Sequence, residues 1–294
     1  MISEQIIKYE FKEGLPFEFE IVDIPSLYKI HRNRMIKPHR TGFYHIFWVK
    51  KAGGSHVVDF SPVSLDENSL LFLNKDTVQI FNPETTLNAK AILFTQAFFA
   101  SSDGDLRFLN ESMLFNDLFT TSTVQISAAN LRTFDRLFSM MEDEASKSKD
   151  DYQPQIIQKL LYTFLLYAER EKKAQGFVEI KPSAERDYLM LFRELLEGSF
   201  KVNKQVTFYS STLSVTERRL NQATSKTLGR TVKQVIDERV ILEAKRLLAH
   251  TNGSIKEVGF SLGFEEPTNF IKFFKKHTSI TPVEFRGTLF DSQA

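Results

Sequence analysis

Two stretches near the end of the chain place hydrogen-bonding side chains at helical spacing. The residues are Arg218, Gln222 and Ser225 in the first stretch and Thr268, Lys272 and Lys275 in the second. Arg and Lys match the acceptor edge of guanine, Gln matches the mixed edge of adenine, and cationic side chains also bind phosphate oxygens. The chemistry open to these residues is recognition of a polyanion.

The second stretch is predicted to lie in a pair of short helices. Ser254 and Glu257 form a capping box, so a helix is expected to begin there. Gly259 lies on the apolar face of this helix, and a small residue there permits a close crossing. The helix is predicted to end near Gly263, and Pro267 suits the first turn of the next one.

The second helix of the pair is predicted to be amphipathic. One side carries Phe270, Phe273 and Phe274, and the opposite side carries Thr268, Lys272 and Lys275. The phenylalanines would dock the helix and leave the polar stripe exposed. Such a helix-turn-helix fits a DNA major groove, although a single pattern of this kind is more often two packed helices.

The pattern occurs a second time, about 50 residues earlier. Ser210 takes the place of Gly259, and Leu220 and Thr224 take the places of Phe270 and Phe274. Between the two units, residues 231–249 predict a connecting helix of roughly 18 to 20 residues, ~30 Å long. Two reading helices on one side of B-DNA must lie ~34 Å apart, so the repetition favours DNA binding.

Residues 208–286 closely resemble the DNA-binding domain of AraC/XylS-type bacterial transcription regulators. The resemblance rests on "IDERVILEAKRLL", "SIKEVGFSLGF", "NFIKFFKK" and "TPVEFR", in that order and spacing. Ser210 and Gly259 stand where the family usually has alanine, and Ser279 stands where it has glycine. The resemblance implies a sequence-specific DNA-binding transcription regulator without catalytic residues.

The resemblance and the helix faces together assign roles to ten residues. The expected base contacts are Arg218, Asn221, Gln222, Thr268, Asn269 and Lys272. The expected phosphate contacts are Lys226, Arg230, Lys275 and Lys276. The alternative for any one of them is an ordinary solvated side chain, above all for Asn221 and Asn269, which lie towards the flanks of their helices.

The first part of the chain predicts β-structure. Short aromatic and β-branched runs fill residues 18–98, with Gly53-Gly54 as a hairpin signal inside "GFYHIFWVKKAGGSHVVDF". This stretch looks like the cupin-type barrel that many such regulators carry, and a barrel or a sandwich fits the pattern. We expect an α+β protein: an N-terminal antiparallel β-barrel, then helices, then an all-α domain with two helix-turn-helix units.

Two histidines, His39 and His45, are candidates for lining an effector pocket in the barrel. Metal-binding cupins carry further ligands, but Thr41 and Gln79 stand at the corresponding positions. Two imidazoles alone make a poor metal site. We therefore expect no metal and no cofactor, and partly exposed structural histidines are the alternative.

Helical periodicity replaces the strand pattern after about Leu109. Two amphipathic segments between Ala128 and Glu171 could form a dimer seam or pack on the barrel. The expected domains are residues 1–110 (barrel), 111–175 (helical dimerisation segment), 176–184 (linker) and 185–290 (DNA-binding domain). The expected partners are double-stranded DNA, a second copy of the chain, a small-molecule effector and RNA polymerase.

Composition narrows the remaining choices. The 294 residues include no cysteine, which excludes disulfides, thiolate metal sites and the cysteine nucleophile of a methyl acceptor. Residues 183–294 hold 17 Lys and Arg against 13 Asp and Glu, although the whole chain carries only +1. Without a predicted signal peptide or spanning segment, we expect a cytoplasmic protein. A cupin metalloenzyme fused to a DNA-binding domain and an unspecific architectural DNA binder remain the alternatives.

Overall fold

The computed structural model describes residues 6–52, 55–82, 88–115, 121–176 and 184–291. The chain divides into an N-terminal unit, Ile7–Glu179, and a C-terminal unit that holds Ile180–Ala294. The predicted linker, residues 176–184, falls almost wholly outside the described residues. None of the described helices combines the length and the apolar character needed to cross a bilayer.

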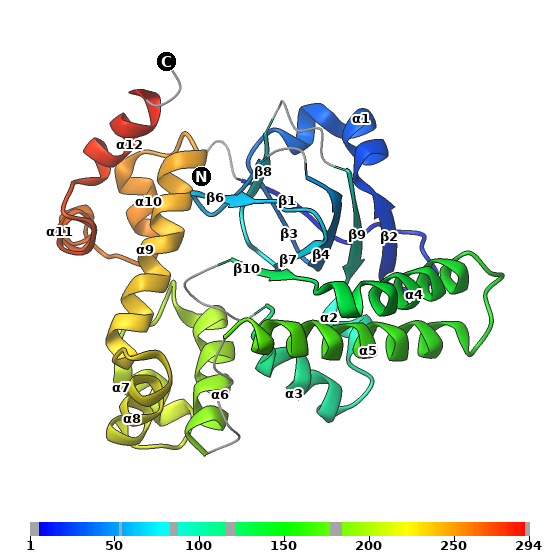
Figure 1. Ribbon diagram of the computed structural model, residues 1–294. Helices are drawn as coiled ribbons and strands as arrows, with labels where there is room; N and C mark the ends of the chain where they lie inside the picture. Colours follow the sequence, from blue (N-terminus) through cyan, green and yellow to red (C-terminus); the bar gives the residue numbers. More distant parts are fainter. Residues whose placement is uncertain (1–5, 53–54, 83–87, 116–120, 177–183, 292–294) are drawn as a thin grey trace. The chain divides into compact units, whose positions relative to one another are not determined.

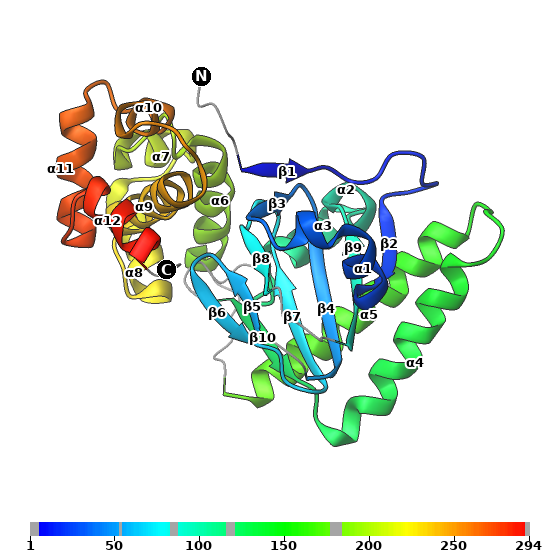
Figure 2. The ribbon, with the colours of Figure 1, turned by 90° about the horizontal axis from the view of Figure 1, so that it is seen from above.

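The N-terminal unit contains ten described strands in two sheets (Figures 1 and 2). The strands are β1 (Ile7–Tyr9), β2 (Phe19–Asp23), β3 (His39–Thr41), β4 (Tyr44–Lys51), β5 (Ser55–Val58), β6 (Ser61–Ser64), β7 (Ser69–Leu73), β8 (Gln79–Phe81), β9 (Asn88–Phe94) and β10 (Ser122–Gln125). The sheet orders are β1-β3-β8-β5-β6 and β10-β7-β4-β9-β2. All pairs are antiparallel except β1 with β3.

The predicted closed barrel is wrong, because among the described residues no strand pair joins one sheet to the other. The sandwich is the alternative that fits. Strand β4 shows how the two sheets stack, because it is buried on both faces. Its Phe47 and Val49 form a core with Val58 and Phe81 of the other sheet. Alternation along the sequence predicts strands, but it does not specify which strand edges pair.

The predicted hairpin at Gly53-Gly54 is also wrong. These glycines lie outside the described residues, but the flanking strands β4 and β5 belong to different sheets. A two-residue hairpin instead joins β5 to β6 through Asp59 and Phe60, which have φ values of 44° and 72°. Left-handed values at both positions are those of a type I′ turn, for which Asp-Phe is an unusual sequence.

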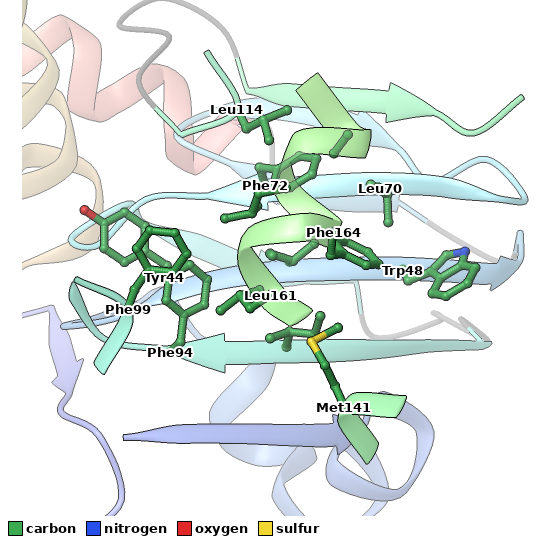
Figure 3. Close-up of a cluster of buried hydrophobic side chains, with 14 of the residues drawn as sticks. Tyr44, Trp48, Leu70, Phe72, Phe94, Phe99, Leu114, Met141, Leu161 and Phe164 are labelled. Carbon is green, nitrogen blue, oxygen red and sulfur yellow. The ribbon is translucent and has the colours of Figure 1, made fainter. Parts of the chain in front are cut away.

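Helices cover the other face of the second sheet. The helices of this unit are α1 (Ile24–Met35), α2 (Gln96–Phe99), α3 (Asp103–Glu111), α4 (Ala128–Ala145) and α5 (Gln153–Ala174). Figure 3 shows Leu161 and Phe164 of α5 lying over side chains of β4 and β7, among them Trp48 and Leu70. The apolar faces of α4 and α5 therefore pack on the sheet, which was one of the two predicted possibilities.

The C-terminal unit is helical. Its helices are α6 (Ala184–Ser199), α7 (Val206–Thr212), α8 (Glu217–Leu228), α9 (Val232–His250), α10 (Ile255–Ser261), α11 (Pro267–Thr278) and α12 (Pro282–Asp291). In Figure 1, α9 is the long helix with α7 and α8 at one end and α10, α11 and α12 at the other; Figure 2 views it nearly end-on. A capping box of Thr231 and Gln234 starts α9, whose 19 residues span about 28 Å.

Candidate nucleic-acid interface

The second predicted helix-turn-helix is α10 and α11. The Ser254–Glu257 capping box is present: Glu257 N–H donates to Ser254 Oγ at 3.2 Å and Ser254 N–H donates to Glu257 Oε2 at 2.8 Å. These hydrogen bonds hold the pKa of Glu257 below its usual value. At the crossing, a Cβ built on Gly259 would lie 3.1 Å from Phe270 Cβ, so a small residue lets the two helices approach.

The two faces of α11 differ as the periodicity predicts. Phe270 and Phe274 are fully buried, while the five predicted contact residues of this helix are exposed: Thr268, Asn269, Lys272, Lys275 and Lys276. Within the described part of the chain, Lys272 and Lys276 form no ion pair. Ser279 ends the helix in the left-handed conformation at φ 68°, which glycine adopts more readily than other residues.

The first helix-turn-helix is α7 and α8. Ser210 is buried at the crossing and Leu220, Ala223 and Thr224 form the buried face of α8. Thr216 caps the helix by accepting the Arg219 N–H at 3.2 Å. Arg218 and Gln222 are exposed on the opposite face, as predicted.

Asn221 lies between α8 and α9 and both ends of its amide are bonded within the protein. Its Oδ1 accepts the Val232 N–H at 3.0 Å, and its Nδ2 donates to Glu217 O at 3.1 Å. Val232 is the first residue of α9, whose N–H has no partner within its own helix. Asn221 therefore ties α8 to α9, a structural role that differs both from the predicted base contact and from the solvated side chain given as the alternative.

Two of the predicted phosphate-binding cations have carboxylate partners. Lys226 Nζ lies 3.0 Å from Glu185 Oε1, and Arg230 is ion-paired with Glu238. Glu185 belongs to the first turn of α6, the helix that packs most extensively on α8. α8 and α11 thus differ, because the two cations near the end of α8 are paired with carboxylates, whereas Lys272 and Lys276 of α11 form no ion pair within the described residues.

Arg219 is a cation of this face that the periodicity did not single out. It lines a hollow of about 340 Å³ between α6 and α8. The other lining residues are Ala184, Glu185, Thr216, Arg218 and Gln222. Its guanidinium also lies 4.9 Å from the ring of Tyr188. In the sequence, the adjacent pair Arg218-Arg219 is the signal that could have identified Arg219.

The histidines predicted to line a pocket lie between the two sheets with a third that was missed. His39, His45 and His56 are all buried, and His56 Nε2 donates to Gln79 Oε1 at 3.1 Å. Nδ1 of His45 and Nδ1 of His56 have no hydrogen-bond partner. Burial lowers the pKa of His45 and of His56 to about 3, so both rings are neutral near pH 7. The pairing of β5 and β3 with β8 places His56 here, and local periodicity does not reveal such long-range pairing.

Metal-binding histidines are neutral, as these rings are. A metal site would also need further ligands, such as carboxylates, close to them. Among the described residues, no group of three or more His, Asp or Glu side chains is arranged to hold a metal ion. His39 Nδ1 donates a hydrogen bond to Lys37 O at 2.8 Å. The residues described here do not provide a complete donor set for the metal of a cupin enzyme.

Comparisons with known proteins agree with this geometry. Residues 209–288 match the family described as "Helix-turn-helix domain". The chain is 30% identical over 105 residues to the uncharacterized HTH-type transcriptional regulator YisR of Bacillus subtilis, a match that covers 36% of this chain and 37% of that protein. It is 21% identical over 260 residues to the HTH-type transcriptional activator RhaS of Pectobacterium carotovorum, covering 85% of this chain and 88% of that one.

Among solved structures, ToxT of Vibrio cholerae aligns with 92% of this chain and 98% of its own chain. The TM-score is 0.43 and the sequence identity is 12%.

Proposed function

We propose that this chain is an AraC/XylS-type transcription regulator that reads two successive major grooves with α8 and α11, which the helix-turn-helix match at residues 209–288 and the similarity to RhaS support. The observation that carries the proposal is the exposed polar face of α11. Its lysines are held outward by a fully buried pair, Phe270 and Phe274. The same arrangement recurs in α8, at the other end of a connector about 28 Å long.

The contacts divide by chemistry. Arg218, Gln222, Thr268, Asn269 and Lys272 contact base edges, since each is exposed on a reading helix and carries the donors that base edges accept. Asn221 sets the position of α8 and reads a base only by giving up its bond to Val232 N–H.

Lys275 and Lys276 bind phosphates, which fix the register of the protein on the duplex. Lys226 and Arg230 do so only after exchanging their carboxylate partners, Glu185 and Glu238, for phosphate. The second helix-turn-helix therefore supplies most of the non-specific electrostatic attraction, and the first contributes mainly base recognition.

Control through the N-terminal unit completes the proposal. A small molecule bound between the sheets would meet the unpaired ring nitrogen of His45 and lie near His39. Exposed apolar side chains on α4 and α5 favour a homodimer; Met140, Ile156 and Leu166 are 53%, 41% and 46% exposed. As a DNA-binding regulator the protein acts in the bacterial cytoplasm, where RNA polymerase is a further partner.

Selection of bound duplexes from a random DNA pool by the full-length protein tests the proposal. We expect an enriched site with two conserved elements centred about one helical turn apart, ~10 to 10.5 base pairs. Enrichment of no sequence, with equal binding to all duplexes, would contradict specific reading and favour an architectural role.

The competing enzymatic function is a cupin-type metalloenzyme joined to a DNA-binding domain. We propose that the protein has no catalytic activity, in keeping with relatives that are transcription regulators. Elemental analysis of the purified full-length protein is the test. One equivalent of iron, manganese or zinc per chain that survives chelator treatment would favour the enzyme.

A further inference from the structure

The two helix-turn-helix units touch at a second place besides α9. The turn between α6 and α7 meets the turn between α10 and α11, where Gly263 has φ +74°. A Cβ built on Gly263 would lie 2.0 Å from Lys201 O, a backbone atom that no side-chain rotation can move away. Only glycine permits this approach, in both its backbone conformation and its lack of a side chain.

Lys204, in the turn between α6 and α7, stabilises the same contact from the side of the first helix-turn-helix unit. Its ammonium donates to Lys201 O at 2.9 Å and lies 4.6 Å from the ring centroid of Phe264, which follows Gly263. Its carbonyl accepts a hydrogen bond from Lys233 Nζ of α9 at 3.2 Å. Burial lowers the pKa of Lys204, and the charge of Lys233 lowers it further.

The turn that carries Lys201 and Lys204 is itself fixed to the connecting helix. Arg239 of α9 binds the carboxylate of Glu197 with Nε at 2.8 Å and Nη2 at 2.9 Å. The same guanidinium lies 3.9 Å from the ring of Phe200, the residue before Lys201. A movement of Gly263 is therefore opposed by α9 as well as by the turn.

We propose that this turn–turn contact, formed by Lys201, Lys204, Gly263 and Phe264, sets the distance and angle between the two reading helices, with Gly263 as its positioning residue. A single helical connection can bend, but two connections at separate points hold the units as one body. The protein then accepts one spacing between its two DNA elements, because no reorganisation is available to fit another. The consequence for DNA rests on the function proposed above, whereas the rigidity does not.

The rigidity is tested without DNA, on the full-length protein. The chain has no cysteine, so Ser225→Cys on α8 and Lys275→Cys on α11 introduce two spin-label sites for distance measurement by electron paramagnetic resonance. We expect a narrow distance distribution. Gly263→Ala should shift or broaden it, because the new methyl group must push Lys201 O away.

Gly229→Ala is the matched control. Gly229 also ends a helix in the left-handed conformation, at φ +66°, but nothing lies within 4 Å of a Cβ built there. Both variants carry the same kind of backbone strain, so a difference between them isolates the turn–turn contact. Lys204→Met, which keeps an apolar stem over Phe264, should broaden the distribution less and serves if Gly263→Ala does not fold.

A second measurement connects the contact to DNA. The duplex selected by the wild-type protein is compared with one that carries an extra base pair between its elements. Wild-type protein and Gly229→Ala should lose about tenfold or more in affinity for the longer duplex, and Gly263→Ala should discriminate less. Distance distributions that are alike in Gly263→Ala, Lys204→Met and Gly229→Ala would overturn the proposal, whatever DNA the protein binds.

Discussion

At the scale of single residues, reading a base differs from binding a phosphate in what a substitution does to sequence preference. Arg218 is exposed on α8 and suits the guanine edge. We expect Arg218→Ala to weaken binding to the selected site by ~1 to 3 kcal/mol and to relax preference at one base pair. Titration of matched and single-mismatch duplexes measures both effects.

The control for Arg218 is its neighbour Arg219, which stacks against Tyr188. Arg219→Ala removes the same charge from the same helix and should weaken binding without relaxing a particular base pair. If Arg218→Ala lowered affinity equally for selected and random duplexes, Arg218 would not be reading a base.

The buried histidines predict acid lability of the N-terminal unit. Burial depresses the pKa of His45 and His56 from 6.5 to about 3. Below pH 6.5 both rings therefore bind protons more readily in the unfolded chain than in the folded one, which favours unfolding. Above pH 6.5 the two neutral rings cost no stability, and the free energy of unfolding decreases as the pH falls from 6.5 towards 3. Each ring should lower the free energy of unfolding by about 1.4 kcal/mol per pH unit in that window.

Urea unfolding between pH 7 and 5 measures this loss, followed by the fluorescence of Trp48, the one tryptophan of the chain. We expect His45→Gln to reduce the pH dependence of the unfolding free energy, since it removes one of the buried rings whose pKa is depressed; His39 and His56 remain. His31→Gln, which changes an exposed histidine of α1, is the control. An equal slope in wild type and His45→Gln would show that His45 is not held neutral.

At the scale of helices, α6 and α8 are linked by an ion pair, and we propose that it competes with DNA for Lys226. Glu185 holds Lys226, with the two side chains 31% and 58% exposed. We expect Glu185→Gln to free Lys226 for phosphate, raise affinity for all duplexes about three- to tenfold, and steepen the salt dependence by about one ion. Binding isotherms at several salt concentrations measure both quantities.

Glu194→Gln provides the control, because it removes the same charge from an exposed position of α6. An increase of the same size in both variants would mean that the change reflects net charge alone. Only a larger effect at position 185 supports a local competition for Lys226.

At the scale of the whole molecule, the exposed apolar side chains of α5 predict self-association. The proposed homodimer would cover Leu166, an exposed leucine of α5. We expect the full-length chain to sediment as a concentration-dependent dimer, and Leu166→Glu to weaken dimerisation about tenfold or more, ~1.4 kcal/mol.

Val202→Glu is the control for Leu166→Glu, because Val202 is a 78% exposed apolar residue of the other unit. It should leave the sedimentation unchanged. A chain that remains monomeric at high concentration would remove dimerisation from the proposed function.

The sequence by itself determined the helix-turn-helix units. Capping boxes, small residues at crossings and the phenylalanine spacing of α11 are interactions between residues a few positions apart. Such signals survive in a linear reading, and they placed the exposed faces of α8 and α11 correctly.

Tertiary structure alone decided how distant segments combine. The open sandwich, the third histidine His56, the Glu185 partner of Lys226 and the approach of Gly263 to Lys201 all join residues more than 15 positions apart. Their geometry depends on strand pairing and helix packing, in which each contact is set by many others. A periodic pattern records which face of an element is apolar, but not which partner covers it.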